Sequence, residues 1–156
     1  GLGQKSGQEF AAKNVSRIMT PKESGMSMDI ASAYPAEAGI QSWNRTVLLK
    51  RNQDEVELTD EYLLKQKPKS LQQVFMTVGN VNLVEAGKIT ISDGFLSMTL
   101  RYDAKKWTAT TELPSTEGME YSSFKTKWDS KPVRRIILTN TAPEAKGKFV
   151  YSFKRD

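Results

Sequence analysis

The sequence of 156 residues contains no histidine and no cysteine. Without histidine, the chain lacks the commonest general base, the commonest zinc ligand and the usual pH switch. Without cysteine, it has neither a disulfide framework nor a thiolate metal site. Catalysis would have to depend on carboxylate, Tyr, Lys or Ser side chains, and no spacing of these residues predicts an active site. We therefore expect no catalytic residue, no metal and no cofactor in this chain.

Long apolar runs are also missing. No run approaches the roughly 20 residues that span a bilayer, and no charged-then-apolar leader opens the sequence, so we expect no membrane partner. The length predicts one hydrophobic core and a single domain over residues 1–156. The chain begins with Gly1 and no methionine, and we expect this start to be a boundary within a larger protein.

The net charge is +5, from 23 basic and 18 acidic residues. The basic excess gathers late in the sequence, at Lys125, Lys127, Lys131, Arg134, Arg135, Lys146, Lys148, Lys154 and Arg155. Such a segment is typical of proteins that bind a sulfated or uronic polysaccharide, or nucleic acid. A solvated sheet face, with lysines that discourage edge pairing, has the same composition and is commoner.

Residues 26–64 carry the clearest structural pattern. Residues 26–30 alternate apolar and polar side chains, as a strand with one buried face does. Pro35 ends this strand because proline cannot donate a hydrogen bond to a sheet. Residues 40–50 predict a central strand, since both of its faces are partly apolar. Residues 51–55 are polar, and residues 56–64 predict the returning arm of a hairpin.

Short strands separated by turn residues also fill the rest of the sequence. They are predicted near residues 10–19, 71–78, 81–85, 88–91, 95–102, 107–113, 134–138 and 148–153. The strand at 95–102 has the most regular alternation, with Leu96, Met98, Leu100 and Tyr102 on one face. Helical periodicity is almost absent, apart from one short turn near Ala36–Ala38. This pattern predicts an all-β fold, an antiparallel β-sandwich of stacked sheets with about ten strands.

Acidic residues concentrate at Asp54, Glu55, Glu57, Asp60 and Glu61. Two carboxylates facing one cleft would be a glycosidase pattern. On a strand, however, Glu57 and Glu61 share one face, whereas Asp60 lies with Leu58 and Tyr62 on the other. We predict a solvated carboxylate face and one inward-leaning carboxylate, Asp60, with no catalytic pair.

Aromatic side chains are the candidates for stacking on sugar rings, although each of them could equally belong to a core. They are Tyr34, Trp43, Trp107, Tyr121 and Trp128. Trp43 lies in the predicted central strand, which favours the core. Trp128 lies between Lys127 and Lys131 and is the better candidate for a surface contact. The predicted substrate-binding residues are Trp128, Lys127, Lys131, Tyr34 and Arg45.

Several short segments are similar to a known family. They are Asp29-Ile30-Ala31, Ala33-Tyr34-Pro35, Glu37-Ala38-Gly39, Ser42-Trp43 and Arg45-Thr46, preceded by Gly3-Gln4, Glu9-Phe10 and Asn14-Val15. In these segments the chain resembles the C-terminal β-sheet region of heparinase II/III-like polysaccharide lyases. The resemblance covers roughly the first 65 residues and consists of structural residues, without a catalytic signature.

This resemblance implies a parent enzyme with an N-terminal α/α toroid joined to stacked antiparallel sheets. Such lyases cleave uronic-acid glycans by β-elimination, with Tyr and His acting in the cleft, and are periplasmic or secreted. Here histidine is absent, no tyrosine matches a catalytic position, and the histidine ligands of the zinc that some members carry are missing. The resemblance therefore implies a non-catalytic domain whose partner is the toroid of the same parent chain.

Two alternatives to this interpretation remain open. One is a stand-alone carbohydrate-binding module for anionic polysaccharide, which the basic late segment and Trp128 favour. The other is a β-rich adhesion or interaction domain, which would carry a large exposed apolar patch. Neither alternative includes nucleic acid or a membrane as the expected partner.

Overall fold

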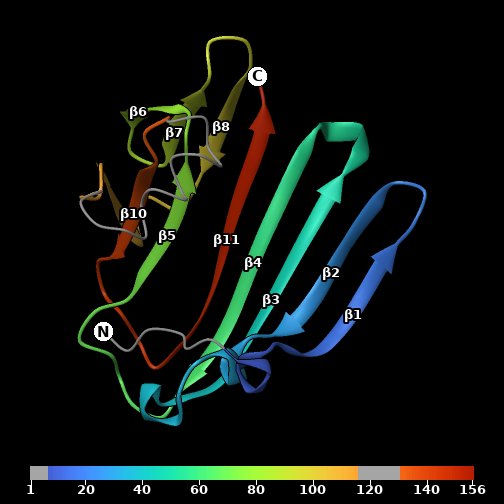
Figure 1. The fold of residues 1–156 in the computed structure, drawn as a ribbon, viewed down its shortest axis with the longest axis vertical. Helices are drawn as coiled ribbons and strands as arrows, with labels where there is room; N and C mark the ends of the chain where they lie inside the picture. Colours follow the sequence, from blue (N-terminus) through green and yellow to red (C-terminus); the bar gives the residue numbers. More distant parts are fainter. Residues whose placement is uncertain (1–6, 116–130) are drawn as a thin grey trace. The chain divides into compact units, whose positions relative to one another are not determined.

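The structure is a computed structural model that describes residues 7–115 and 131–156. The described residues form an all-β antiparallel fold whose helical segments are all three-residue 3-10 turns (Figure 1). The strands are β1 (Lys13–Met19), β2 (Glu23–Asp29), β3 (Ile40–Lys50), β4 (Glu55–Leu64), β5 (Gln72–Thr77), β6 (Asn80–Glu85), β7 (Lys88–Ser92), β8 (Ser97–Arg101), β9 (Trp107–Glu112), β10 (Arg134–Asn140) and β11 (Lys146–Arg155). The predicted β-sandwich class is confirmed.

The described chain divides into two compact units. The first unit comprises residues 7–70 and 142–154. Its strands follow the order β1-β2-β3-β4-β11, so four strands consecutive in sequence form a meander to which β11 is added beside β4. Strand β3 occupies the predicted residues 40–50, and β4 begins one residue earlier than predicted.

The second unit comprises residues 71–115, 131–141 and 155–156. It contains a three-stranded sheet of order β5-β10-β9 and the consecutive strands β6, β7 and β8. Strand β6 lies against both β9 and β10, so two sheets stack within this unit. Ile89, Leu100, Trp107, Ile136 and Leu138 are buried and form its core. Alternating apolar residues on short strands therefore fill a sandwich core, as this architecture requires.

Short 3-10 turns are more numerous than predicted. The expected turn is present as η3 (Ala36–Ala38), but η1 (Gln8–Phe10), η2 (Ala31–Ala33) and η4 (Arg51–Gln53) occur as well. The turn η4 lies in the predicted polar loop between β3 and β4. It is followed by Asp54 in a left-handed conformation with φ of 48°. Aspartate tolerates this region of backbone space better than most residues do.

Strand β8 does not have the predicted one-sided burial. Leu100 is buried, but Met98 is 40% exposed and Thr99 is only 5% exposed. The hydroxyl of Thr99 donates a hydrogen bond to the carboxylate of Asp156 at 2.7 Å. Asp156 is distant in the sequence and satisfies the buried hydroxyl of Thr99. A polar residue is therefore buried at a position where the apolar–polar alternation of the strand predicts exposure.

Candidate functional site

The register of the first unit places side chains of two different kinds on its two faces. Residues opposite each other on neighbouring antiparallel strands point to the same face. One face is mainly apolar and is called the apolar face below. It is formed by Arg17, Met19, Ser24, Met26, Met28, Trp43, Arg45, Val47, Leu49, Val56, Leu58, Asp60, Tyr62, Phe149, Tyr151 and Phe153. The other face is polar and includes Ser16 and Ser27, whose hydroxyls are 2.9 Å apart.

An ion pair lies within the apolar face. Arg45 Nε is 2.8 Å from Asp60 Oδ1, and Arg45 Nη2 is 2.7 Å from Asp60 Oδ2. The Asp60 side chain is 1% exposed and the Arg45 side chain 27% exposed. The hydrogen bond that Arg45 donates to Asp60 is the largest cause that raises the pKa of Arg45 above its usual value. The prediction of one inward-leaning carboxylate is therefore confirmed, and this carboxylate is held by a bidentate guanidinium.

The neighbouring carboxylates do not join Asp60. Glu57 and Glu61 belong to the polar face of β4, where Lys50 and Lys148 pair with them at 2.6 and 2.5 Å. No second carboxylate of this acidic cluster thus shares a cleft with Asp60, and the glycosidase pattern is not assembled here.

Three stacked rings cross the same face. The Trp43 and Tyr62 ring centroids are 5.1 Å apart, and those of Tyr62 and Phe149 are 5.4 Å apart. Gly147 lies opposite Tyr62 in the register, where a Cβ would come within 2.9 Å of the tyrosine ring. The Tyr62 hydroxyl donates to the carbonyl oxygen of Glu144 at 3.2 Å. Trp43 is half-buried and stacks on Tyr62, so it is not among the fully buried core residues.

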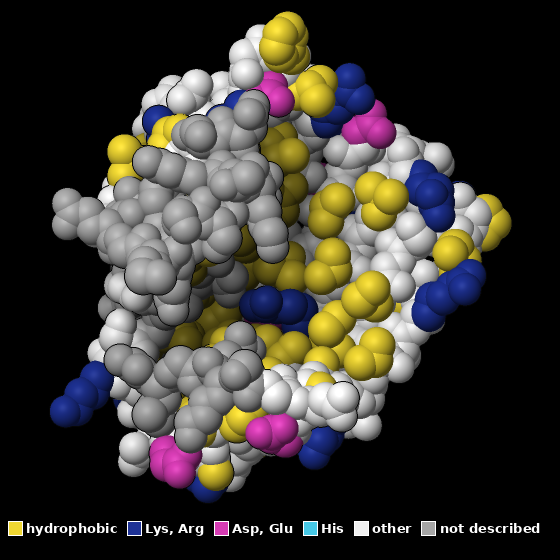
Figure 2. All heavy atoms as spheres, in the orientation of Figure 1, with side chains coloured by type: hydrophobic (Ala, Val, Ile, Leu, Met, Phe, Trp, Pro, Cys, Tyr) yellow, Lys and Arg dark blue, Asp and Glu magenta, His cyan; other side chains and the backbone are white. Residues whose placement is uncertain are grey.

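The apolar face is only partly covered. Met19 and Met26 are 55% and 47% exposed, and Val15 and Leu49 are exposed too. These four residues belong to β1, β2 and β3 and are called the exposed margin below. Figure 2 shows hydrophobic side chains gathered over this part of the first unit. Methionine side chains are flexible and polarizable, which suits a surface that adapts to a partner.

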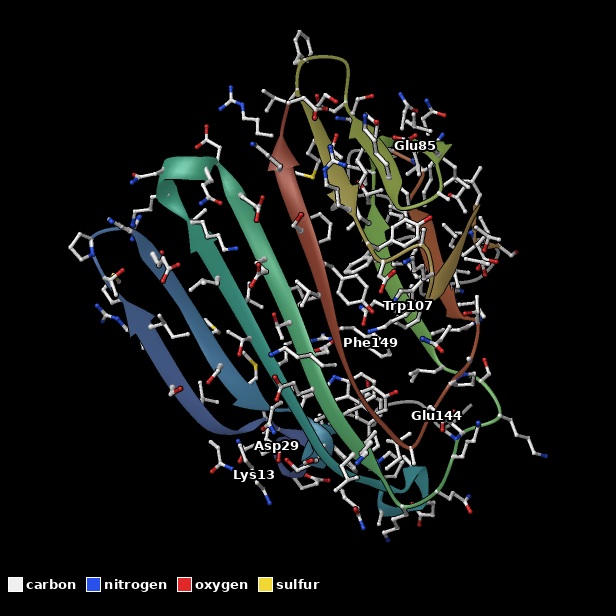
Figure 3. All side chains as sticks on the ribbon, turned by 180° about the vertical axis from the view of Figure 1, so that it is seen from behind. Lys13, Asp29, Glu85, Trp107, Glu144 and Phe149 are labelled. Atoms are coloured by element: carbon white, nitrogen blue, oxygen red, sulfur yellow. The ribbon has the colours of Figure 1, made fainter. Side chains whose placement is uncertain are left out.

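The resembling segments from Asp29 to Trp43 follow one another from the last residue of β2, through η2 and η3, into β3. Gly3 and Gln4 lie outside the described residues. Asp29 Oδ1 accepts hydrogen bonds from the backbone N–H groups of Ala31 at 2.9 Å and Trp43 at 3.1 Å. Asp29 thereby fixes the end of β2 and the start of η2 (Figure 3). Ala33 is buried. Gly39 ends η3 with φ of 67°, a conformation that glycine adopts without steric cost.

The predicted substrate-binding residues fall in different parts of the chain. Tyr34 and Arg45 both lie in the first unit, where Tyr34 makes a minor electrostatic contribution to the raised pKa of Arg45, after the hydrogen bond to Asp60. Lys131 is exposed in the second unit. Lys127 and Trp128 lie outside the described residues, as does Tyr121. Sequence reasoning missed the exposed margin, because alternation predicts which side chains share a face and not whether another layer covers it.

Lys131 lies near the turn between β7 and β8, where Asp93 organises the backbone. Asp93 Oδ1 accepts hydrogen bonds from the N–H groups of Leu96 at 2.9 Å and Phe95 at 3.0 Å. The bond from Leu96, then that from Phe95, and to a smaller extent the charge of Lys131 lower the pKa of Asp93 below its ordinary value of 3.8. The ionised carboxylate is therefore the form that holds this turn.

A titration measures this effect directly. We expect the Asp93 carboxyl carbon, followed by NMR, to titrate with a midpoint below 3.8. Because the pKa is lowered on folding, the contribution to stability is present above the unfolded pKa and is lost as pH falls through the folded one. Lys131→Ala should move the midpoint slightly upward, and a midpoint at or above 3.8 in the unsubstituted chain would contradict this assignment.

In residues 7–115 and 131–156, no cluster of three or more acidic side chains is arranged to hold a metal ion. None of the helical segments in these ranges has the length and apolar character needed to cross a bilayer. No protein-family model matches the sequence, and no curated protein matches it either.

Proposed function

We propose that this chain is the non-catalytic β-sandwich of a heparinase II/III-like polysaccharide lyase, whose parent enzyme cleaves uronic-acid glycans by β-elimination. In this proposal the domain supports an N-terminal α/α toroid of the same parent chain, in the periplasm or outside the cell. The exposed margin of the apolar face is the observation that carries the proposal. A sheet normally buries its apolar face against another layer. The exposed side chains of Val15, Met19, Met26 and Leu49 mark the part of this face that no described layer covers.

The side chains of the apolar face favour a structural role over a catalytic one. β-Elimination needs a base for the C5 proton and a group that stabilises the charge developing on the carboxylate side. Asp60 is already engaged by Arg45. Burial raises the pKa of Tyr62, and its hydroxyl donates to a backbone carbonyl. Asp60, Arg45 and Tyr62 are thus committed to the fold.

The resembling segments support the same role. Asp29 ties two backbone amides, Gly39 ends a 3-10 turn and Trp43 stacks on Tyr62. Each of these three residues stabilises the fold, as expected for a family resemblance that includes no catalytic residue. Tyr34 and Arg45 belong to these segments and to the same unit, and we propose that they line part of the glycan cleft when the toroid is in place.

An activity assay and a gene sequence test this function. The purified chain should form no unsaturated uronate from heparin, chondroitin sulfate or alginate, and product formation by the chain alone would contradict a non-catalytic role. The open reading frame upstream of Gly1 should encode a helical region that contains Tyr and His, and its absence would contradict the lyase assignment. Calorimetric binding of these glycans by the chain alone at low salt would favour the carbohydrate-binding module instead.

A further inference from the structure

The hairpin between β7 and β8 ends in an unusually exposed aromatic side chain. Phe95 is 96% exposed, whereas large aromatic residues in folded proteins are mostly buried. The hairpin belongs to the second unit, so this feature is separate from the apolar face and independent of the proposed lyase role.

The backbone holds Phe95 in this position. Asp93 Oδ1 accepts hydrogen bonds from the Phe95 and Leu96 amides, and the Asp93 amide donates to the Leu96 carbonyl at 3.2 Å. Gly94 has φ of 96°, which a residue with a side chain rarely adopts. The turn is therefore already ordered, and binding through Phe95 costs little further conformational entropy.

An apolar groove of about 310 Å³ lies beside the hairpin tip in the same unit. Val78, Ile91, Leu96 and Met98 contribute its apolar walls, and Asp93 and Arg155 lie among its lining residues. Leu96 and Met98 are themselves exposed. Phe95 does not fill this groove, since almost the whole of its side chain is in contact with solvent.

We propose that the groove receives Phe95 of a second copy of this chain. The projecting ring and the groove lie on one patch, so a twofold axis through that patch inserts the ring of each copy into the groove of the other. Such a contact is isologous, the arrangement found in most homodimers. The same axis allows Asp93 of one copy to approach Arg155 of the other, which gives the contact charge complementarity.

A second copy fits this patch better than an anionic membrane or glycan does. The ionised carboxylate of Asp93 at the base of the aromatic tip needs a cationic partner, which Arg155 of a second copy supplies and an anionic surface does not. A sugar would need several polar partners in the groove, whose walls are mainly apolar. A phenyl ring is small enough for this volume and needs no polar partner. Because the patch is small, the dimer should be weak and depend on concentration.

Sedimentation velocity on the full chain tests the proposal from about 1 µM to about 1 mM, the range in which a weak dimer forms. We expect reversible dimerisation. In parallel, the methionine methyl groups are followed by NMR, and Met98 should shift with concentration while Met19 and Met26 should not. Phe95→Ala should raise the dissociation constant at least about tenfold, as expected for a central aromatic anchor.

Two further variants distinguish loss of the dimer contact from loss of folding. Circular dichroism shows whether each variant is folded. Met98→Lys alters the groove at an exposed position and should also weaken the dimer, whereas Val84→Ala, exposed on β6, should leave it unchanged. A monomer over the whole range, or a dimer that Phe95→Ala leaves intact, would overturn the proposal. So would binding of anionic vesicles or heparin that depends on Phe95 in a chain that does not self-associate.

Discussion

Replacing Asp60 by alanine lowers the free energy of unfolding by about 3–5 kcal/mol. The Asp60 carboxylate is almost completely buried and accepts two short hydrogen bonds from Arg45. Its removal takes away the anion that accepts both of these hydrogen bonds from the guanidinium in the apolar face. Urea unfolding at neutral pH, followed by tryptophan fluorescence and circular dichroism, measures the loss.

Replacing both members of the pair shows whether the effect comes from the pair. Arg45→Met/Asp60→Leu replaces both charges by apolar groups of similar size and should be considerably more stable than Asp60→Ala, since a buried ion pair replaced as a whole is often neutral. The Lys67–Glu144 pair is the matched control, because both of its side chains are mostly exposed. Glu144→Gln should cost less than about 1 kcal/mol. A loss below about 1 kcal/mol for Asp60→Ala would contradict the structural role of the buried pair.

Gly25→Ala destabilises the chain by about 3 kcal/mol, at the upper end of what overpacking costs. A Cβ at position 25 would overlap the carbonyl oxygen of Val47 and would lie 3.0 Å from Leu48 Cα. Both atoms belong to the backbone of β3, with which β2 pairs. The clash cannot be relieved by a side-chain rotation, so the two strands must separate locally.

Gly147→Ala is the matched control for Gly25→Ala. The added Cβ would meet the ring of Tyr62 at 2.9 Å, and a side chain can move where a backbone cannot. We expect a smaller loss, about 1–2 kcal/mol. Thermal unfolding of both variants under identical conditions gives the comparison. Equal losses, or a Gly25→Ala variant within about 0.5 kcal/mol of the unsubstituted chain, would contradict the close approach of β2 to β3.

Local periodicity predicts the strands of this chain well, because a strand with one buried face repeats every two residues. It correctly places β3 and turns Asp60 inward on β4. It does not identify Arg45 as the partner of Asp60, since that pairing depends on the register across a loop with Asp54 in a left-handed conformation. One residue of slip would move either side chain to the opposite face.

Other features depend on contacts far apart in the sequence and are not visible in a local pattern. Gly25 lies inside β2, where its small size permits the approach of β3. Thr99 is buried because Asp156 accepts its hydrogen bond. Phe95 is exposed although its side chain is strongly apolar. Hydrophobicity predicts burial on average and cannot identify such an exception.

We propose, as the central claim, that the exposed margin is the surface on which the toroid of a parent lyase packs. The most direct test labels the methionine methyl groups of this chain and adds the polypeptide encoded upstream of Gly1, produced separately. The account predicts a stable complex in which the Met19 and Met26 methyl signals shift and lose solvent exposure, while Met76, exposed on β5 in the second unit, is unchanged. No complex, or a complex that leaves Met19 and Met26 unchanged, would contradict it.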